Sequence, residues 1–439
     1  MKRVCRCGAA VLLGILCLGL QARSQQAVNP LTDELKSTDA NIRARAARDL
    51  GNSGDTSTVP ALTAALKDPS TKVRKSVIVA LEKLHTTGAL DGLVFASHDS
   101  DPDVRTLAVD ALVGWYTGNV PALGFSGTFK RSYNNTVAWI QNDTTRVSPG
   151  IRVDPRSISA LEAALEDTRS IQASRDAARG LGILTAREAV PQLVKAAHSP
   201  DEELAVDSLD SLSKIKEISA GPQVADLLDS PSKSVRQSAC ITVGILRTQS
   251  AVPKLQQIYQ TDTDKNTRNA ALDGLAFIGN PSSDPVFLTA LQSPDRDQRE
   301  YAAEGLARAR DSAALNALNQ RMSVEKHAGV RLAILFALVS IGQTQRLRDL
   351  VDALDSRTHG DVAQSYLIEL TRRKDLLAAV YPYLNDSNST IRRKLCVVLM
   401  YSGDASSLSH LSPLTHDRNN DVAAAALRAT QAIRSRTNA

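Results

Sequence analysis

Aromatic residues and cysteines are scarce in this chain. Phe, Trp and Tyr make up only 4% of its 439 residues, so its interior must consist mainly of smaller side chains such as Leu, Ala and Val. Of the five cysteines, only Cys240 and Cys396 lie outside the first 20 residues. Both occupy the same place in a sequence repeat, where other copies carry apolar residues. We therefore interpret them as buried apolar side chains, and not as a disulfide or as metal ligands.

Motifs for catalysis and metal binding are also missing. The sequence contains no HExxH, CxxC or CxxCH motif, no glycine-rich phosphate loop and no dinucleotide-binding fingerprint. Two acidic stretches, 99–110 and 262–273, have the spacing of a calcium loop, but Val104 and Thr267 stand where such a loop requires glycine. We interpret their aspartates as helix caps and turn formers. The sequence predicts no catalytic residue, no cofactor and no metal site, and it favours a protein that is not an enzyme.

A basic stretch followed by an apolar one begins the chain. Lys2, Arg3 and Arg6 precede an apolar run from 9 to 20, and residues 22–24 offer a small-x-small cleavage site. This pattern predicts a signal peptide over residues 1–24, with a retained membrane anchor as the alternative. The leader holds four of the 52 basic residues and no acid, which leaves 48 basic against 47 acidic residues. We expect a secreted or periplasmic protein, without a nucleic-acid partner and without membrane insertion after signal removal.

Residues 59–84 show the unit from which the rest of the chain is built. Pro60 stands where a short first helix begins, a position where its missing N–H costs nothing. An Asp-Pro-Ser turn at 68–70 ends that helix. In the second helix, Val73, Val77 and Leu81 lie on one face at helical spacing. Because such a pair leaves apolar surface on both sides, further pairs must cover it.

The unit recurs with a period near 31 residues. We take Arg74, in the first turn of the second helix, as the anchor of the repeat. The residue four positions after each anchor is apolar, and the residue seven positions after it is leucine in ten of twelve copies. The anchors are residues 43, 74, 105, 174, 205, 236, 268, 299, 331, 363, 392 and 423. This phase predicts twelve stacked helical hairpins.

The motif V-R-x-x-A-x-x-A-L after an Asp-rich turn, as at residues 104–112, resembles HEAT-like repeats, notably the short form found in phycobilin lyases. The resemblance covers residues 31–117 and 157–435. It implies an all-α, right-handed α-solenoid of about twelve stacked helical hairpins with one irregular insert. Repeats 1–3 would occupy residues 25–117, an insert or degenerate repeat 118–156, and repeats 4–12 residues 157–439.

The anchor arginines lie beside the positive end of a helix dipole, so each needs an anionic neighbour. The acids expected to compensate them stand four residues earlier, at Asp39, Asp101, Asp264 and Asp295. In HEAT-like repeats such residues bridge neighbouring hairpins. We interpret the arginines as structural, and not as a phosphate-binding stripe.

Residues 118–156 interrupt the repeat and are rich in aromatic side chains. Trp115, just before the insert, falls at a core position of the repeat. The candidate partner-binding residues are Tyr116, Phe125, Phe129, Lys130, Arg131, Tyr133 and Trp139. Aromatic side chains beside a basic pair are typical of binding hot spots. The alternative is that they pack back on the neighbouring helices and fill the space between the third and fourth hairpins.

The function favoured by the sequence is that of an exported scaffold that binds an unknown protein partner and is itself a monomer. One alternative, implied by the resemblance, is a bilin-lyase-like enzyme that handles a chromophore. Export argues against it, because that chemistry belongs inside the cell. The other alternative is a structural spacer without a specific ligand.

The repeat register makes Leu275 equivalent to the leucines at 81, 112 and 306. Leu275→Ala should lower the free energy of unfolding by about 2–5 kcal/mol, since it removes a buried side chain. Lys75→Ala, at a position expected to be exposed, should change it by less than about 0.5 kcal/mol. Denaturant unfolding of both variants measures this. Equal small losses would show that the register is wrong.

Overall fold

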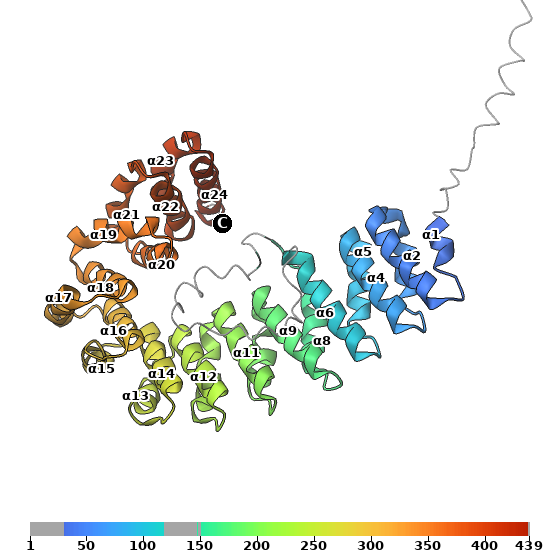
Figure 1. The fold of residues 1–439 in the computed structure, drawn as a ribbon, viewed down its shortest axis with the longest axis horizontal. Coiled ribbons are helices and arrows are strands. Elements are labelled where there is room, and N and C mark those ends of the chain that lie inside the picture. Colours follow the sequence, from blue (N-terminus) through green and yellow to red (C-terminus); the bar gives the residue numbers. More distant parts are fainter. Residues whose placement is uncertain (1–29, 118–146, 148–150, 438–439) are drawn as a thin grey trace, which may run out of the picture. The chain divides into compact units, whose positions relative to one another are not determined.

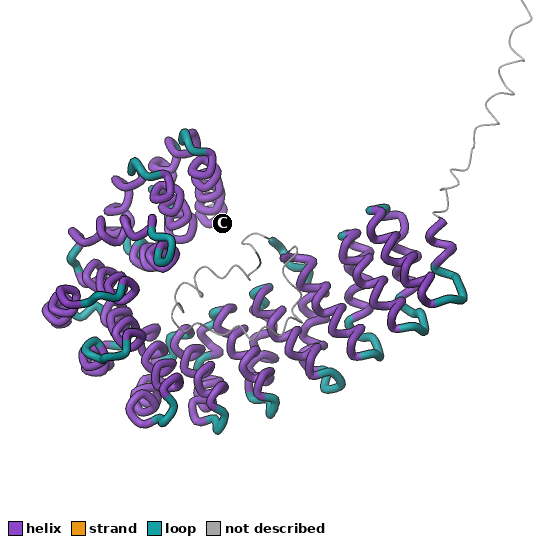
Figure 2. Tube along the Cα trace, viewed as in Figure 1, coloured by secondary structure: helices purple, strands orange, loops and turns teal. Residues whose placement is uncertain are grey.

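The computed structural model describes residues 30–117, 147 and 151–437, and all regular elements within them are helices (Figures 1 and 2). First and second helices alternate along the described residues and form twelve hairpins, from α1 to α24. The predicted all-α repeat fold is confirmed. None of the described helices is long and apolar enough to cross a bilayer.

The first helices of the hairpins are mostly short. They are α1 (Pro30–Glu34), α3 (Val59–Ala65), α5 (Thr87–Ala96), α8 (Pro155–Glu166), α10 (Val190–Ala197), the 3-10 helix η5 (Pro222–Asp229), α13 (Val252–Thr261), α15 (Asp284–Ala290), α17 (Leu315–Val324), α19 (Leu347–Asp352), α21 (Lys374–Val380) and α23 (Ser407–Leu411).

The second helices are longer and carry the anchor residues. They are α2 (Ala40–Ser53), α4 (Thr71–Leu84), α6 (Pro102–Thr117), α9 (Ile171–Ile183), α11 (Glu202–Ile215), α12 (Lys233–Ile245), α14 (Lys265–Ile278), α16 (Arg296–Ala309), α18 (Ala328–Ile341), α20 (Gly360–Leu370), α22 (Ser389–Ser402) and α24 (Asn420–Thr437).

The helices fall into two compact units, Met1–Ala96 and Ser97–Ala439. The division lies between α5 and α6, which are the two helices of the third hairpin. The interruption of the repeat at 118–156 lies within the second unit, between α6 and α8.

Aspartate side chains begin many of the second helices. Asp39 accepts a hydrogen bond from the backbone N–H of Asn41 at 2.7 Å. Asp201, Asp264 and Asp295 accept from backbone N–H groups at the starts of α11, α14 and α16. These bonds satisfy donors that the first turn of a helix leaves without a partner, which confirms the interpretation of the turn aspartates as caps.

The leucines seven residues after the anchors form the core between hairpins. Leu81, Leu112, Leu275 and Leu306 are each 0% exposed, as the register predicts. Lys75, one residue after its anchor, is half-buried and not exposed as expected. It lies at the margin of the helix face that packs against the neighbouring helices.

Cys240 and Cys396 are buried free thiols. Burial raises the pKa of both, to about 12 for Cys396. They therefore stay protonated at neutral pH and pack as small apolar side chains, as predicted from their place in the repeat.

Each anchor arginine binds the turn that precedes its own helix. Nη1 of Arg43 donates to the carbonyl oxygens of Ser37 at 2.8 Å and Thr38 at 3.1 Å. The arginines at 74, 105, 236, 268, 299 and 392 likewise donate to the carbonyls six and five residues earlier. The guanidinium group thereby ties the end of the first helix to the start of the second.

Several anchors also pair with an acid of the next hairpin. Arg43 binds both carboxylate oxygens of Asp68, at 2.6 and 2.9 Å. Arg392 binds both oxygens of Asp417, each at 2.8 Å, and this hydrogen bond lowers the pKa of Asp417. The same ladder includes Arg236 with Asp262 and Arg299 with Glu325. The anchor arginines therefore join neighbouring hairpins.

The acids predicted to compensate the anchors are not the ones that bind them. Asp39, Asp101, Asp264 and Asp295 instead accept from backbone N–H groups of their own helices. The pairing acid lies in the turn of the following hairpin, 25 residues away for Arg43. The stacking of hairpins places that turn beside the guanidinium group, so proximity along the chain misidentifies the partner.

The fourth hairpin has Ser174 at the anchor position and closes its turn differently. Ser174 Oγ lies within hydrogen-bonding distance of the carbonyl oxygens of Ala164 and Asp167, both at 3.1 Å. The link to the next hairpin passes to the neighbouring Arg175, which binds Asp201 at 2.9 and 2.5 Å. The ladder continues here with its two functions divided between two residues.

The buried pair Arg299–Glu325 tests the ladder. Their side chains are 5% and 1% exposed. Burial works to raise the pKa of Glu325, but hydrogen bonds from Arg299, Arg321 and a backbone N–H lower it to about 2. Glu325→Gln leaves a buried cation without its counter-ion, which should cost about 3–5 kcal/mol of unfolding free energy. Denaturant unfolding measures the loss.

The matched control is Glu188→Gln, which makes the same chemical change at an exposed position. It should alter the unfolding free energy by less than about 0.5 kcal/mol. A Glu325→Gln loss no larger than that of the control would contradict a structural role for the ladder.

Candidate binding surface

Tyr116 is the one candidate partner-binding residue that the described part of the chain includes. Its hydroxyl accepts a hydrogen bond from the backbone N–H of Asp154 at 3.1 Å and lies 2.9 Å from Ser157 Oγ. Tyr116 thus fixes the start of α8 against the end of α6. The adjacent Trp115 is half-buried and not fully in the core as predicted.

The other six candidates, Phe125, Phe129, Lys130, Arg131, Tyr133 and Trp139, lie outside the described residues. Val147, close to the end of the interruption, donates from its backbone N–H to the carbonyl of Ile183 at 2.9 Å. A partner site at these aromatic residues stays a prediction.

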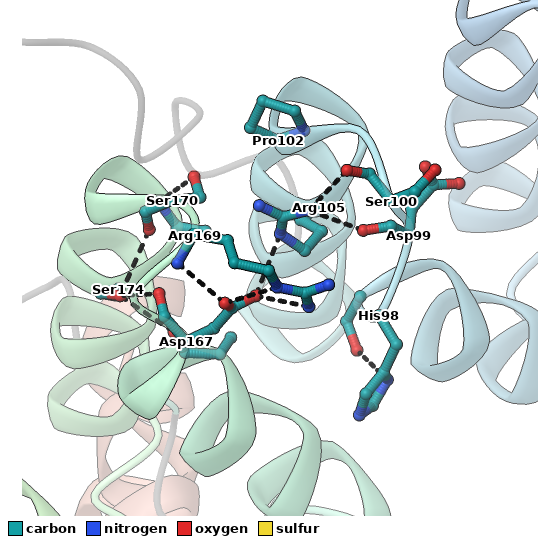
Figure 3. A network of polar contacts seen from close by, with 12 residues as sticks. His98, Asp99, Ser100, Pro102, Arg105, Asp167, Arg169, Ser170 and Ser174 are labelled. Atoms are coloured by element: carbon teal, nitrogen blue, oxygen red, sulfur yellow. Dashed lines mark hydrogen bonds and ion pairs between the residues drawn. The ribbon is translucent and has the colours of Figure 1, made fainter.

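The third and fourth hairpins are joined directly by α6, α8 and α9. Arg105 Nε lies 3.2 Å from Asp167 Oδ2, and Figure 3 shows the two side chains meeting between the hairpins. A Cβ atom added to Gly180 would lie 2.5 Å from Cγ2 of Val113, so α9 packs tightly on α6. The ladder thus continues across an interruption in the sequence.

Asp167 is held between two arginines at this junction. Arg169 binds both of its carboxylate oxygens at 2.8 Å, from the side opposite Arg105 (Figure 3). The hydrogen bond from Arg169, with smaller help from Arg105, lowers the pKa of Asp167 to about 2. The carboxylate therefore remains charged at any pH at which the protein is folded and serves the junction.

The two calcium-like stretches act in helix capping. Asp101 accepts from the backbone N–H groups of Asp103 and Val104, and Asp264 accepts from that of Thr267. Among the described residues, no group of three His, Cys, Asp or Glu side chains is placed to hold a metal ion.

A further surface emerges from the second helices. We define the second-helix face as the positions two before and one, two, five, eight and nine after the anchor. In the first unit this face is basic. It presents Arg45 and Arg48 on α2 and Lys72, Lys75 and Lys83 on α4, which together we call the basic face.

The two helices of the basic face are cross-linked by neutral groups. Lys72 Nζ donates to Asn41 Oδ1 and Lys83 Nζ to Asn52 Oδ1, both at 2.7 Å. These bonds show that the rows on α2 and α4 lie side by side. Arg45 makes an exposed ion pair of 3.6 Å with Glu34 of α1.

Among the residues of the face in the first unit, the one acid is Glu82, a half-buried residue of α4. Burial raises the pKa of its carboxyl group. The sequence already held this signal, because the basic residues share register positions. Attention to the anchors alone concealed it.

The same face is rich in acids in the second unit, from α6 to α16. The acids are Asp103, Asp110, Asp176, Glu203, Asp207, Asp210, Asp273, Asp297, Glu300 and Glu304; the bases are Arg175, Arg179, Lys214 and Arg308. The pKa of Asp207 rises to about 7, because burial and the nearby carboxylates of Asp210 and Asp176 outweigh the attraction of Arg179.

Arg308 ties three second helices of this unit together. From α16 it binds both carboxylate oxygens of Glu369 on α20, at 2.9 and 3.1 Å. Its Nη1 donates to the carbonyl oxygen of Ala276 on α14 at 3.2 Å and to Glu304 at 3.3 Å. The pair with Glu369 therefore reaches across the intervening helix α18.

Tyr366 completes this network from α20. Its hydroxyl donates to Glu304 Oε1 at 2.5 Å, and its ring stacks on Phe336 of α18 with the ring centres 4.4 Å apart. Burial raises the pKa of both the Glu304 carboxyl and the Tyr366 hydroxyl. The arrangement joins α16, α18 and α20 through hydrogen bonds and ring stacking.

Glu300 lies beside this network on α16. Burial, together with repulsion from Glu304, Asp297 and Asp273, raises the pKa of its carboxyl group to about 8, against the weaker attraction of Arg296. The raised value reflects the acidic surroundings, and it means that the group carries a proton at neutral pH.

Glu300 should make stability depend on pH. Its folded pKa of about 8 lies above the ordinary 4.5, so the stabilising proton uptake is fully present below pH 4.5 and is lost as the pH rises through 8. The slope reaches at most about 1.4 kcal/mol per pH unit. Glu300→Gln, which stays neutral, should flatten the decline of unfolding free energy between pH 5 and 9 in denaturant melts.

Glu202→Gln, an exposed change at the start of α11, is the matched control and should keep the original slope. An unaltered slope in Glu300→Gln would contradict a protonated Glu300.

The sequence matches family models over much of its length. A model described as HEAT repeats matches residues 28–113, 221–299 and 284–371. A model described as PBS lyase HEAT-like repeat matches residues 175–199. No curated protein matches the chain.

Two similar solved structures show how far the likeness in shape extends. The crystal structure of an engineered protein is 17% identical, with 92% of this chain and 98% of that chain covered and a TM-score of 0.41. The complex of CpcE and CpcF of phycocyanin lyase from Nostoc sp. PCC7120 is 20% identical, with 60% and 94% covered and a TM-score of 0.37. Because the model for HEAT repeats matches more than half of the sequence, the chain belongs to the HEAT-repeat family.

Proposed function

We propose that this protein is an exported HEAT-repeat scaffold whose second-helix face binds a protein partner. The observation that carries the proposal is the different use of charge on two sides of the hairpins. On the turn side, anchor arginines such as Arg43, Arg299 and Arg392 are bound to carbonyls and acids of the stack itself.

The second-helix face of the first unit is different. Its exposed basic side chains bind amides and a hydroxyl, as in the contact of Arg48 Nη1 with Ser76 Oγ at 3.0 Å. Such contacts leave the positive charge without a buried counter-ion, and the stacking of hairpins does not require them. Charged side chains that the fold does not need are available for a partner.

Export is the second part of the proposal, and it follows from the predicted signal peptide at residues 1–24. Fractionation of cells that express the full-length protein tests this part separately. Release of a shortened chain outside the cytoplasm is expected, and retention of the full-length chain in the cytoplasm would contradict it.

Affinity capture on the purified protein tests the scaffold function. We expect an envelope or secreted extract to yield a partner that, once purified, binds directly and saturably with a Kd in the micromolar range or below, as specific complexes do. An unrelated helical-repeat protein of similar size is the matched bait. Recovery of the same proteins by both baits would contradict the proposal and favour a structural spacer.

A further inference from the structure

The basic face is a continuous array of cations on two neighbouring helices. Arg45 and Arg48 lie one turn apart on α2, and Lys72 and Lys83 bracket the same face of α4. The bonds from Lys72 to Asn41 and from Lys83 to Asn52 fix the two rows in register. Cations one turn apart are separated by about 5–6 Å, and packed helices by about 8–10 Å.

We propose that the basic face binds an extended acidic segment of a partner protein, one in which Asp or Glu alternates with small residues. This inference rests on the proposed function, because it specifies the partner of the scaffold. In an extended chain, alternate side chains point the same way about 7 Å apart. Carboxylates at that spacing meet successive cations along and across α2 and α4, while Asn41 and Asn52 offer amides to the peptide backbone.

The composition of the face favours a polypeptide over other anions. Residues 40–84 contain no Phe, Tyr or Trp on which a nucleic-acid base could stack. Within the described residues of the first unit, the one large apolar side chain that is exposed is Phe95 on α5, a first helix. A membrane-binding surface would place such side chains among its cations, so that they enter the lipid. The basic face has cations and amides only, apart from Val79 and Glu82.

Fluorescence anisotropy with the full-length protein tests this inference. The probe is a labelled twelve-residue peptide of alternating Glu and Ser, and the competitors are the Lys–Ser peptide, oligo-dT and vesicles of equimolar phosphatidylcholine and phosphatidylglycerol. Binding of the Glu–Ser peptide should weaken steeply as ionic strength rises from about 0.01 to about 1 M, because the charges are exposed and become screened.

The decisive variant combines Arg45→Gln, Lys72→Gln and Lys83→Gln. The matched control combines Arg418→Gln, Lys326→Gln and Lys374→Gln, which removes the same charges from exposed positions outside the face. We expect the first variant to bind the Glu–Ser peptide at least tenfold more weakly and the control to bind it like the original protein. Circular dichroism melts of both variants verify that they are folded.

Three outcomes would overturn the inference. They are equal peptide affinity of the two variants, preference for oligo-dT or the vesicles over the peptide, and unchanged affinity of the first variant for the partner recovered by affinity capture. The last outcome would leave the proposed function standing while removing the basic face as its site. Failure of affinity capture, with intact peptide binding, would instead remove the proposed partner and keep the face.

Discussion

The stack depends on one interaction, the arginine that binds its own turn and the turn of its neighbour. Arg392 shows the full pattern, with Nη1 on the carbonyls of Asp386 and Ser387 and the other N–H groups on Asp417. A cation at the start of a helix opposes the helix dipole. It is tolerated here because its planar donors satisfy carbonyls and a carboxylate at the same time.

The periodic part of this fold was predictable because it arises from local chemistry. Proline at a helix start, aspartate at a cap and leucine seven residues after an anchor each act within one hairpin and recur in every copy. The pairing of Arg43 with Asp68 was not predictable in this way, since it depends on the offset between stacked hairpins. The link from Arg105 to Asp167 was harder still, because the sequence between them breaks the period.

The candidate surface was missed for a different reason. Its residues were visible in the register, but the sequence analysis searched for chemistry at the anchors and in the aromatic insert. Position on a helix distinguishes the two uses of the same residue type. Arg74 is buried and donates to the carbonyl of Asp68, whereas Arg45, on the same kind of helix, is exposed. A side chain that the stack does not employ is the better indicator of function.

The contact of Arg308 with Glu369 has a meaning for how the array comes apart. Repeat proteins are described well by energies of single repeats and of adjacent interfaces, so they fray from their ends one hairpin at a time. A bond that reaches from α16 past α18 to α20 adds coupling between second neighbours. Loss of α20 would strand the buried guanidinium of α16. These helices should therefore melt as one cooperative block, at which fraying from the C-terminal end of the chain comes to a halt.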